Sequence, residues 1–246
     1  MTNVEKLSEI LSQSKNAVFF GGAGMSTESG IPDFRSADGI YNQTFGKNLR
    51  PEEIVTHSFF MHCPEDFYKF YRTRILYLDA KPNAGHIALA ELEKRGILSA
   101  VITQNIDGLH QAAGSKNVYE LHGSVKRSFC MKCGENYDLD FIVKNTPIPY
   151  CKKCGGIVRP DVVLYEENLE PELVTKVVGV IAKADTLIVG GTSLAVYPAA
   201  GFIDYFNGEY LVIINKTETH ADREAELIIR ENIGETLSEA VRLLDC

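Results

Sequence analysis

Four of the six cysteines stand in two matched pairs. Two residues separate Cys130 from Cys133 and Cys151 from Cys154, and 17 residues (134–150) separate the pairs. Each C-x-x-C turn aims two thiolates at one point, and two such turns form a tetrahedral four-sulfur site that suits zinc. Because four protein ligands fill the shell of the metal, we expect one structural Zn²⁺ and no catalytic zinc. A redox dithiol or unpaired core cysteines are the alternatives, but neither explains two matched pairs.

A glycine-rich turn near the amino terminus could bind a pyrophosphate. An apolar run at 17–20 leads into Gly-Ala-Gly at 22–24, and consecutive glycines after a strand let the backbone approach phosphate oxygens. Thr27 stands where the fingerprint G-x-G-x-x-G has its third glycine. The region about 20 positions further on does not look like the end of a strand, so a hydride-transfer site is disfavoured. The turn alone is also compatible with a loop that binds no ligand.

Three further segments carry side chains for binding and proton transfer. Residues 32–35, Pro-Asp-Phe-Arg, either line a wall over a bound ring or form a loop anchored by an Asp–Arg pair. Residues 104–107 follow a predicted strand at the edge where open α/β sheets bind ligands, although Asn105 or Asp107 could instead cap a helix. His122 lies between this loop and the cysteines. An imidazole pKa near ~6.5 suits a general base, whereas a lone histidine is more often structural.

The elements that would position these residues alternate along the chain. Short apolar runs predict strands at 17–20, 98–103, 186–189 and 210–214. Apolar periodicity and flanking residues predict helices at 4–13, 84–94, 172–183, 198–206 and 235–244. Strands that are apolar on both faces and alternate with helices are typical of a parallel sheet. We therefore predict an α/β fold: a Rossmann-like parallel sheet with helices on both faces.

Two stretches interrupt this alternation. Residues 37–81 are rich in aromatic and charged residues and are predicted to be mostly helical, with a helix start at Pro64. Residues 128–159 hold the cysteine pairs and short turns. We interpret both stretches as insertions that pack beside the main sheet.

Composition excludes some classes of protein. The formal net charge of -8 creates no basic field for nucleic acid. No secretory signal opens the chain, and no apolar stretch reaches the ~20 residues that span a bilayer. We expect a cytoplasmic protein with no membrane partner, in which Cys63 and Cys246 are ordinary thiols and no disulfide framework forms.

Six motifs in one order give the chain a resemblance to the sirtuins, the NAD-dependent protein deacylases. They are residues 22–26, 30–35, 103–107, 121–123 and 191–198 together with the four cysteines, and the resemblance covers nearly the whole chain. The resemblance implies one catalytic unit over residues 1–246, with a large Rossmann-like domain (1–36, 82–127 and 160–246) and a small domain made of the helical insert 37–81 and the zinc ribbon 128–159. It also implies that NAD and an acyl-lysine peptide meet in a cleft between the two domains. The nicotinamide–ribose bond breaks and the acyl oxygen attacks the ribose, which yields free lysine, nicotinamide and O-acyl-ADP-ribose. NAD is thus consumed as a co-substrate.

The resemblance also assigns roles. His122 would be the general base that activates a ribose hydroxyl, and Asn105 would contact ribose and water at the catalytic centre. The implied NAD contacts are Ala23, Thr27, Phe34, Arg35, Gln104, Ile106, Asp107, Thr192, Ser193, Asn215 and Ile233. The substrate peptide would add as a strand between 163–167 and 194–197, where the contacts are Val163, Tyr165, Leu194 and Val196.

Three positions depart from the family pattern. Gly21 replaces a threonine and is expected to loosen the glycine turn without removing phosphate binding. Glu166 adds a carboxylate beside the expected peptide site, where it could alter peptide preference. The Tyr–Arg pair of succinyl-preferring relatives corresponds by spacing to Tyr68 and Tyr71, which favours acetyl over succinyl; a shifted alignment to Tyr71 and Arg74 is the alternative and fits worse.

The leading hypothesis is an NAD-dependent protein-lysine deacetylase, an acyltransferase that moves acetyl to ADP-ribose. Acetyl-lysine proteins or peptides would be its partners, and we expect a monomer. The alternatives are a protein mono-ADP-ribosyltransferase, a deacylase for longer acyl groups, or a zinc-ribbon module that binds acetyl-lysine without turnover. A dehydrogenase is the least favoured reading.

Overall fold

The computed structural model describes residues 1–33 and 49–245. Its larger part is built on a six-stranded sheet with the order β3-β2-β1-β7-β8-β9, in which all neighbouring strands pair in parallel. The strands are β1 (Ala17–Gly21), β2 (Leu98–Thr103), β3 (Val118–Glu120), β7 (Thr186–Gly190), β8 (Tyr210–Ile214) and β9 (Leu227–Ile229). Every residue of β1 and β7 is buried, as the apolar runs predict. The predicted fold class is confirmed.

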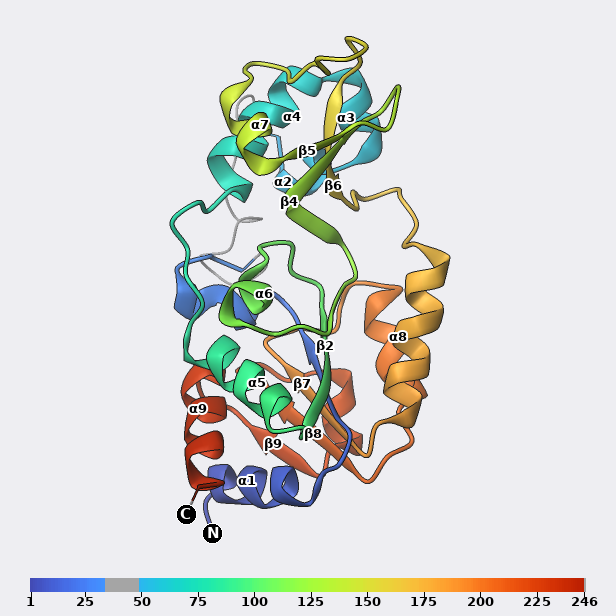
Figure 1. The fold of residues 1–246 in the computed structure, drawn as a ribbon. Helices are drawn as coiled ribbons and strands as arrows, with labels where there is room; N and C mark the ends of the chain where they lie inside the picture. The colour runs from blue at the N-terminus through green and yellow to red at the C-terminus, as the bar shows by residue number, and fades with distance from the viewer. Residues whose placement is uncertain (34–48, 246) are drawn as a thin grey trace.

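Helices cover both faces of this sheet (Figure 1). One face packs on α1 (Asn3–Gln13), α5 (Ala84–Lys94) and α9 (Ile233–Leu243), and the other on α8 (Pro171–Lys183) and the 3₁₀ segment η4 (Ala199–Tyr205). Two further segments, α6 (Leu109–Ala113) and η5 (His220–Glu224), complete the larger part. Side chains fix where helices begin: the Thr2 hydroxyl accepts the Glu5 N–H, and the Asn83 side chain accepts the N–H groups of Gly85 and His86.

All four predicted strands and four of the five predicted helices agree with the structure. The predicted α-helix at 198–206 is wrong in type, because Ala199–Tyr205 forms a 3₁₀ segment. The sequence patterns do not predict strands β3 and β9; each has three residues and lies at an edge of the sheet. The segment after the glycine turn is a short 3₁₀ helix, η1 (Ala23–Ser29).

The smaller part lies above the carboxyl ends of the parallel strands (Figure 1). A three-stranded antiparallel sheet with the order β5-β4-β6 is made by β4 (Gly123–Cys130), β5 (Asn136–Asp138) and β6 (Val158–Val162). It packs with α2 (Pro51–Ile54), α3 (His57–His62), α4 (Pro64–Phe70), the π-helical turn η3 (Tyr71–Ile75) and α7 (Leu139–Lys144). The predicted helix start at Pro64 is confirmed.

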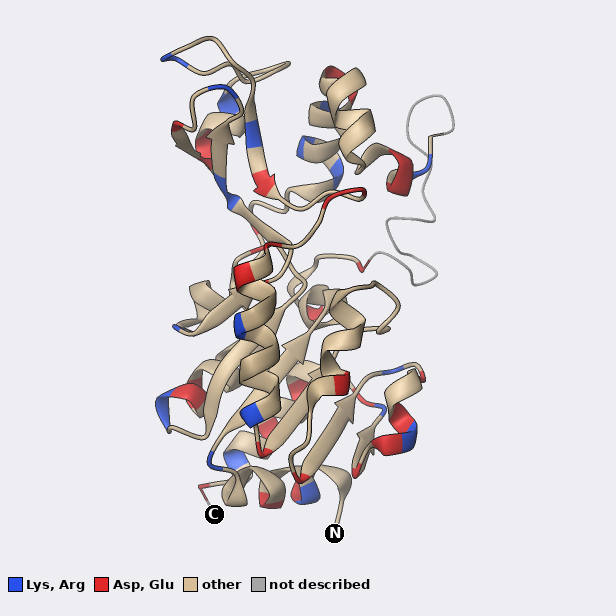
Figure 2. Cartoon of the chain, turned by 90° about the vertical axis from the view of Figure 1, so that its right-hand side faces the viewer, with Lys and Arg blue, Asp and Glu red and all other residues tan. Residues whose placement is uncertain are grey.

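Charged residues of both signs are spread over the two parts on the side that Figure 2 shows. Within residues 1–33 and 49–245, no helix combines the length and the apolarity needed to cross a membrane. The proposed division at 37–81 and 128–159 stays a prediction, and the small sheet extends past the second range at both ends, from Gly123 to Val162.

Candidate active site

A cleft of about 790 Å³ separates the parallel sheet from the smaller part. Its floor is formed by residues that follow β1, β2, β7 and β8, namely Gly22, Gln104, Gly191 and Asn215. Open parallel sheets bind ligands at this edge because the strand ends and the loops that follow them converge there. The roof comes from β6 and the segment after it, and from α4 and η3.

The glycine turn packs against the loop that follows β7. Gly22 N–H donates to the Gly190 carbonyl at 3.2 Å, and Gly24 N–H donates to the Gly191 carbonyl at 2.8 Å. A Cβ on Gly24 would lie 2.8 Å from the Cα of Gly191, so no side chain fits at this position. The glycines therefore hold two backbone loops together at the edge of the cleft, and Ala23 and Thr27 line it beside them.

The expectation that Gly21 loosens the turn is wrong. Gly21 is buried at the end of β1, pairs with Gly190, and accepts the Gln104 N–H at 3.0 Å. A Cβ there would lie 2.5 Å from a ring atom of Phe19. The missing side chain thus makes room for the Phe19 ring, and the strand end stays fully paired.

A polar cluster joins the 104–107 loop to the glycine turn. The Ser26 hydroxyl donates to one Asp107 carboxylate oxygen at 2.7 Å, and Asn105 Nδ2 donates to Ser26 Oγ at 3.0 Å. The other Asp107 oxygen accepts the Leu109 N–H at 2.8 Å, which is the helix-capping contact considered above. Burial raises the Asp107 pKa, and the two hydrogen bonds to its carboxylate, which favour the charged form, offset only a part of that rise. Asp107 therefore caps α6 and faces the cleft at the same time.

His122 is oriented by the same loop. Its Nδ1 lies 2.9 Å from the Gln104 carbonyl oxygen, which can only accept, so Nδ1 carries the proton and Nε2 keeps a lone pair. Burial lowers the pKa of His122, and the hydrogen bond to Gln104, which raises the pKa, offsets only a part of this effect. The ring is therefore neutral near pH 7 and can accept a proton at Nε2.

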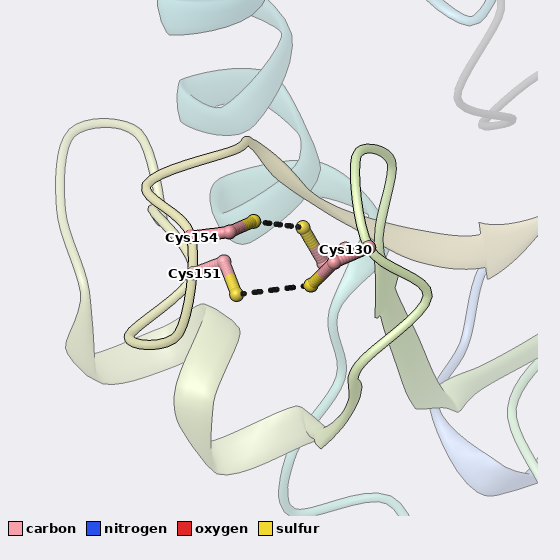
Figure 3. Close-up of side chains that lie close together, drawn as sticks. Cys130, Cys151 and Cys154 are labelled. Carbon is pink, nitrogen blue, oxygen red and sulfur yellow. Dashed lines mark hydrogen bonds between the residues drawn. The ribbon is translucent and has the colours of Figure 1, made fainter.

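The four cysteines lie together away from the cleft. Their Sγ atoms all fall within 4.8 Å of one another, with Cys130–Cys154 at 3.4 Å and Cys133–Cys151 at 3.7 Å (Figure 3). A tetrahedral site with Zn–S bonds of ~2.3 Å requires sulfurs roughly 3.8 Å apart. Three donors also face the sulfurs: Lys132 N–H, Lys153 N–H and the Tyr137 hydroxyl, at 3.4, 3.3 and 3.2 Å. The donor set fits one Zn²⁺ with no open position.

Among the described residues that were predicted to bind NAD or peptide or to act in catalysis, all but Leu194 line the cleft. Those that line it are Ala23, Thr27, Gln104, Asn105, Ile106, Asp107, His122, Val163, Tyr165, Thr192, Ser193, Val196, Asn215 and Ile233. The Leu194 side chain instead packs in the core beneath the sheet and is only 3% exposed. Its backbone is left-handed, with φ of 50°. Phe34 and Arg35 lie outside the described residues.

Some lining residues were not named from the sequence. Glu28 accepts the Gly234 N–H at 2.8 Å and so joins the glycine turn to α9. Lys126 lies along Gly108, where an added Cβ would meet its side chain at 3.3 Å. The charge of Lys126 offsets a part of the rise that burial causes in the Asp107 pKa. These contacts join segments distant in sequence, and no local pattern signals them.

Comparisons with known proteins agree with this geometry. The family model described as the Sir2 family matches residues 22–198. The chain belongs to the Sir2 family. Two proteins named NAD-dependent protein deacetylase resemble this Sir2-family chain over its length. The one from Clostridium perfringens is 56% identical and covers 97% of this chain and 98% of its own. The one from Clostridium acetobutylicum is 54% identical and covers 98% and 99%.

Solved structures of Sir2 proteins have the same fold. A complex described as Sir2 with p53 peptide and NAD⁺ superposes with a TM-score of 0.86 at 39% identity, covering 100% of this chain and 98% of the other. A Sir2 variant with deacetylated p53 peptide and 3′-O-acetyl ADP-ribose gives a TM-score of 0.90 at 37% identity, covering 98% of each chain.

Proposed function

We propose that this Sir2-family chain is an NAD-dependent protein-lysine deacetylase. It would remove acetyl groups from lysine side chains while consuming NAD, with nicotinamide and O-acetyl-ADP-ribose as the other products. The observation that carries the proposal is the neutral His122 held at the cleft with Nδ1 bonded to Gln104 and Nε2 available as a base. The full-length likeness to proteins named deacetylases supports the activity.

NAD would lie along the carboxyl edge of the sheet. Ala23 and Thr27 would face the phosphates and ribose, with Asn215 and Ile233 on the adenosine side. Asp107 would bind the nicotinamide carboxamide, and its bonds to Ser26 and Leu109 would hold the carboxylate in place. The predicted contacts of Phe34 and Arg35 remain part of the proposal.

The acetyl-lysine would enter beneath the 163–167 segment. Val163 N–H donates to the His122 carbonyl at 2.9 Å, which places this segment next to the proposed base. His122 Nε2 would take a proton from a ribose hydroxyl, which could then attack the carbon of the transferred acetyl group. Val163, Tyr165 and Val196 line the adjoining cleft and would contact the peptide.

The domain division, the role of zinc and the substrate class belong to the same proposal. Residues 1–36, 82–127 and 160–246 would form the NAD-binding domain, and 37–81 with 128–159 the small domain. Zinc, held by the four thiolates, would stiffen the ribbon and take no part in the reaction. Acetyl-lysine proteins of the cytoplasm would be substrates for a monomeric enzyme.

Product analysis tests the activity. The protein is incubated with NAD and an acetyl-lysine peptide, and the peptide mass and free nicotinamide are measured. We expect a peptide lighter by one acetyl group and one nicotinamide per deacetylated lysine. A peptide heavier by ADP-ribose would indicate the transferase alternative, and NADH would indicate a dehydrogenase.

An acyl panel tests the preference. The wall of the cleft near Tyr71 is formed by its ring stacked on Phe67 at 5.8 Å, and the Tyr71 phenol is buried. A succinyl carboxylate would lose its hydration beside this neutral wall. Acetyl-lysine and propionyl-lysine peptides should therefore be processed faster than a succinyl-lysine peptide of the same sequence. Faster desuccinylation would contradict the preference for acetyl.

A further inference from the structure

The segment 163–167, which borders the proposed base, is paired with the start of the helical insert. Tyr165 N–H donates to the Val55 carbonyl, and His57 N–H donates to the Tyr165 carbonyl, each at 3.0 Å. Thr56 and Tyr165 thus form a parallel bridge. The backbone that would receive the peptide is therefore held on the helical insert as well as on His122.

Glu166 connects the same two segments through its side chain. One carboxylate oxygen accepts both the Ser58 N–H at 2.8 Å and the Ser58 hydroxyl at 2.6 Å. These bonds lower the Glu166 pKa, so the carboxylate is charged at neutral pH. The extra carboxylate thus binds within the protein, and its expected effect on peptide preference stays a prediction.

The backbone of Glu166 is strained. Its φ of 74° lies in the left-handed region, which a residue with a side chain adopts only where its surroundings hold it there. The paired backbone of the preceding residue, Tyr165, and the two bonds from Ser58 to the Glu166 carboxylate hold this strained residue in place. Without the carboxylate, residue 166 can relax to a negative φ, which rotates the adjoining peptide plane and moves the Tyr165 carbonyl away from His57.

Glu167 holds the base of the same loop and is not part of that contact. Its carboxylate accepts from Arg159 at 2.7 and 2.5 Å and from the Leu164 N–H at 2.9 Å, and one oxygen lies 2.7 Å from His57 Nδ1. Glu167 is largely buried, whereas Glu166 and Ser58 are exposed. The loop can therefore keep its base when the outer contact between Ser58 and Glu166 is removed.

We propose that the Glu166–Ser58 contact is a latch that fixes the 163–167 segment for the substrate peptide, which makes Glu166 a positioning residue. The inference rests on the proposed function, because it concerns the acetyl-lysine peptide of that reaction. Glu166 touches neither NAD nor the reacting atoms in this account. Its loss should weaken peptide binding and leave NAD binding and the chemical step intact.

Four variants distinguish the effect of losing the Glu166–Ser58 contact from the effect of backbone strain at residue 166. Glu166→Ala removes the carboxylate and keeps a residue that resists a positive φ, whereas Glu166→Gly removes it but fits the backbone. Ser58→Ala removes the hydroxyl donor alone, and Ser58→Thr restores a hydroxyl. Glu65→Ala, at an exposed position of α4, is the matched control. The three positions of substitution lie outside the proposed catalytic and NAD contacts.

The primary measurement is binding of a fluorescein-labelled acetyl-lysine peptide, followed by anisotropy, because it does not depend on turnover. We expect Kd to rise about fivefold for Glu166→Ala and less for Glu166→Gly, as loss of a charge-assisted bond at an exposed site predicts. Ser58→Ala should weaken binding by about half that factor, and Ser58→Thr should restore it. Steady-state kinetics should show a raised peptide KM with an unchanged kcat and an unchanged NAD KM.

Two results overturn the latch. One is an unchanged peptide Kd in Glu166→Ala, including the case in which only its melting temperature falls, since a purely structural role moves stability alone. The other is an equal rise in the NAD KM. If the wild-type protein binds the peptide but releases no nicotinamide, the proposed function is contradicted. The comparison of peptide Kd between the wild-type protein and the variants still tests the latch in that case. Wild-type protein that binds no acetyl-lysine peptide contradicts both.

Discussion

At the scale of single residues, the account depends on which atoms of the cleft can exchange protons and which are already bonded. His122 Nδ1 is committed to the Gln104 carbonyl, and both Asp107 oxygens accept hydrogen bonds. The sequence motifs predicted that these residue types would meet at one edge of the sheet. They could not predict the bonds between them, because those bonds depend on side-chain directions set by packing.

The pH dependence of turnover tests the state of His122. Burial lowers its pKa below the ordinary value near 6.5. A general base works above its pKa, so the acid limb of kcat/KM for the acetyl peptide should have its midpoint below pH 6.5. Rates are measured from pH 5 to 8 with a buffer series of constant ionic strength. A midpoint above pH 6.5 would argue against this assignment.

Ser26 should matter for NAD through the two side chains it bonds. Ser26→Ala leaves the Asp107 carboxylate and the Asn105 amide each short of a partner inside the protein. Such a loss costs about 1–3 kcal/mol, which corresponds to a rise of at least about fivefold in the KM for NAD. Ser29→Ala is the control, since the buried Ser29 hydroxyl has no hydrogen-bond partner among the described residues. Equal effects of the two variants would refute this role of Ser26.

At the scale of elements, apolar pattern predicted the strands that are buried on both faces and missed the short ones at the edges. All three residues of β3 are half-buried, so Val118–Glu120 carries no continuous apolar run. The burial of the Leu194 side chain could not be predicted for a related reason, and its main-chain contact with the peptide stays a prediction. The left-handed backbone of Leu194, which follows β7, directs its side chain into the core. No local sequence pattern predicts this turn. Local patterns therefore predict regular elements better than they predict turns.

Zinc removal tests the role assigned to the ribbon. The cysteine turns end β4 and precede β6, so loss of metal should loosen the small sheet and lower the melting temperature. Elemental analysis should find one zinc per chain, and Cys151→Ser should lose both zinc and stability. Cys63→Ser, at an exposed thiol, should change neither. Full stability and full zinc content in Cys151→Ser would contradict the four-sulfur site.

At the scale of the whole molecule, two buried histidines join α5 to α6 behind the cleft. The rings of His86 and His110 lie 4.7 Å apart, and both residues are at most 1% exposed. Burial lowers the pKa of His86 to about 4; burial, and secondarily the charge of His86, lower that of His110 to about 3. Neither position was singled out from the sequence, because their burial results from tertiary packing.

This pair predicts how the protein responds to acid. In the unfolded chain both histidines titrate near ~6.5, so below that pH the unfolded state binds more protons and the free energy of unfolding falls. Each histidine contributes up to about 1.4 kcal/mol per pH unit until the pH approaches its lowered pKa. Urea unfolding between pH 7 and 4 should show a shallower slope for His110→Leu and the wild-type slope for His220→Gln, an exposed site. Identical slopes in all three proteins would refute this explanation.

The central claim is that the cleft deacetylates lysine with NAD and His122 as the base. A single-turnover reaction of enzyme in excess over an acetyl-lysine peptide, with saturating NAD, tests it most directly. We expect the wild-type protein to form deacetylated peptide and O-acetyl-ADP-ribose in equal amounts. His122→Gln should slow both by about 100-fold or more while the Kd for NAD stays within about twofold. A His122→Gln protein that deacetylates at the wild-type rate, or a wild-type reaction without O-acetyl-ADP-ribose, would contradict the account.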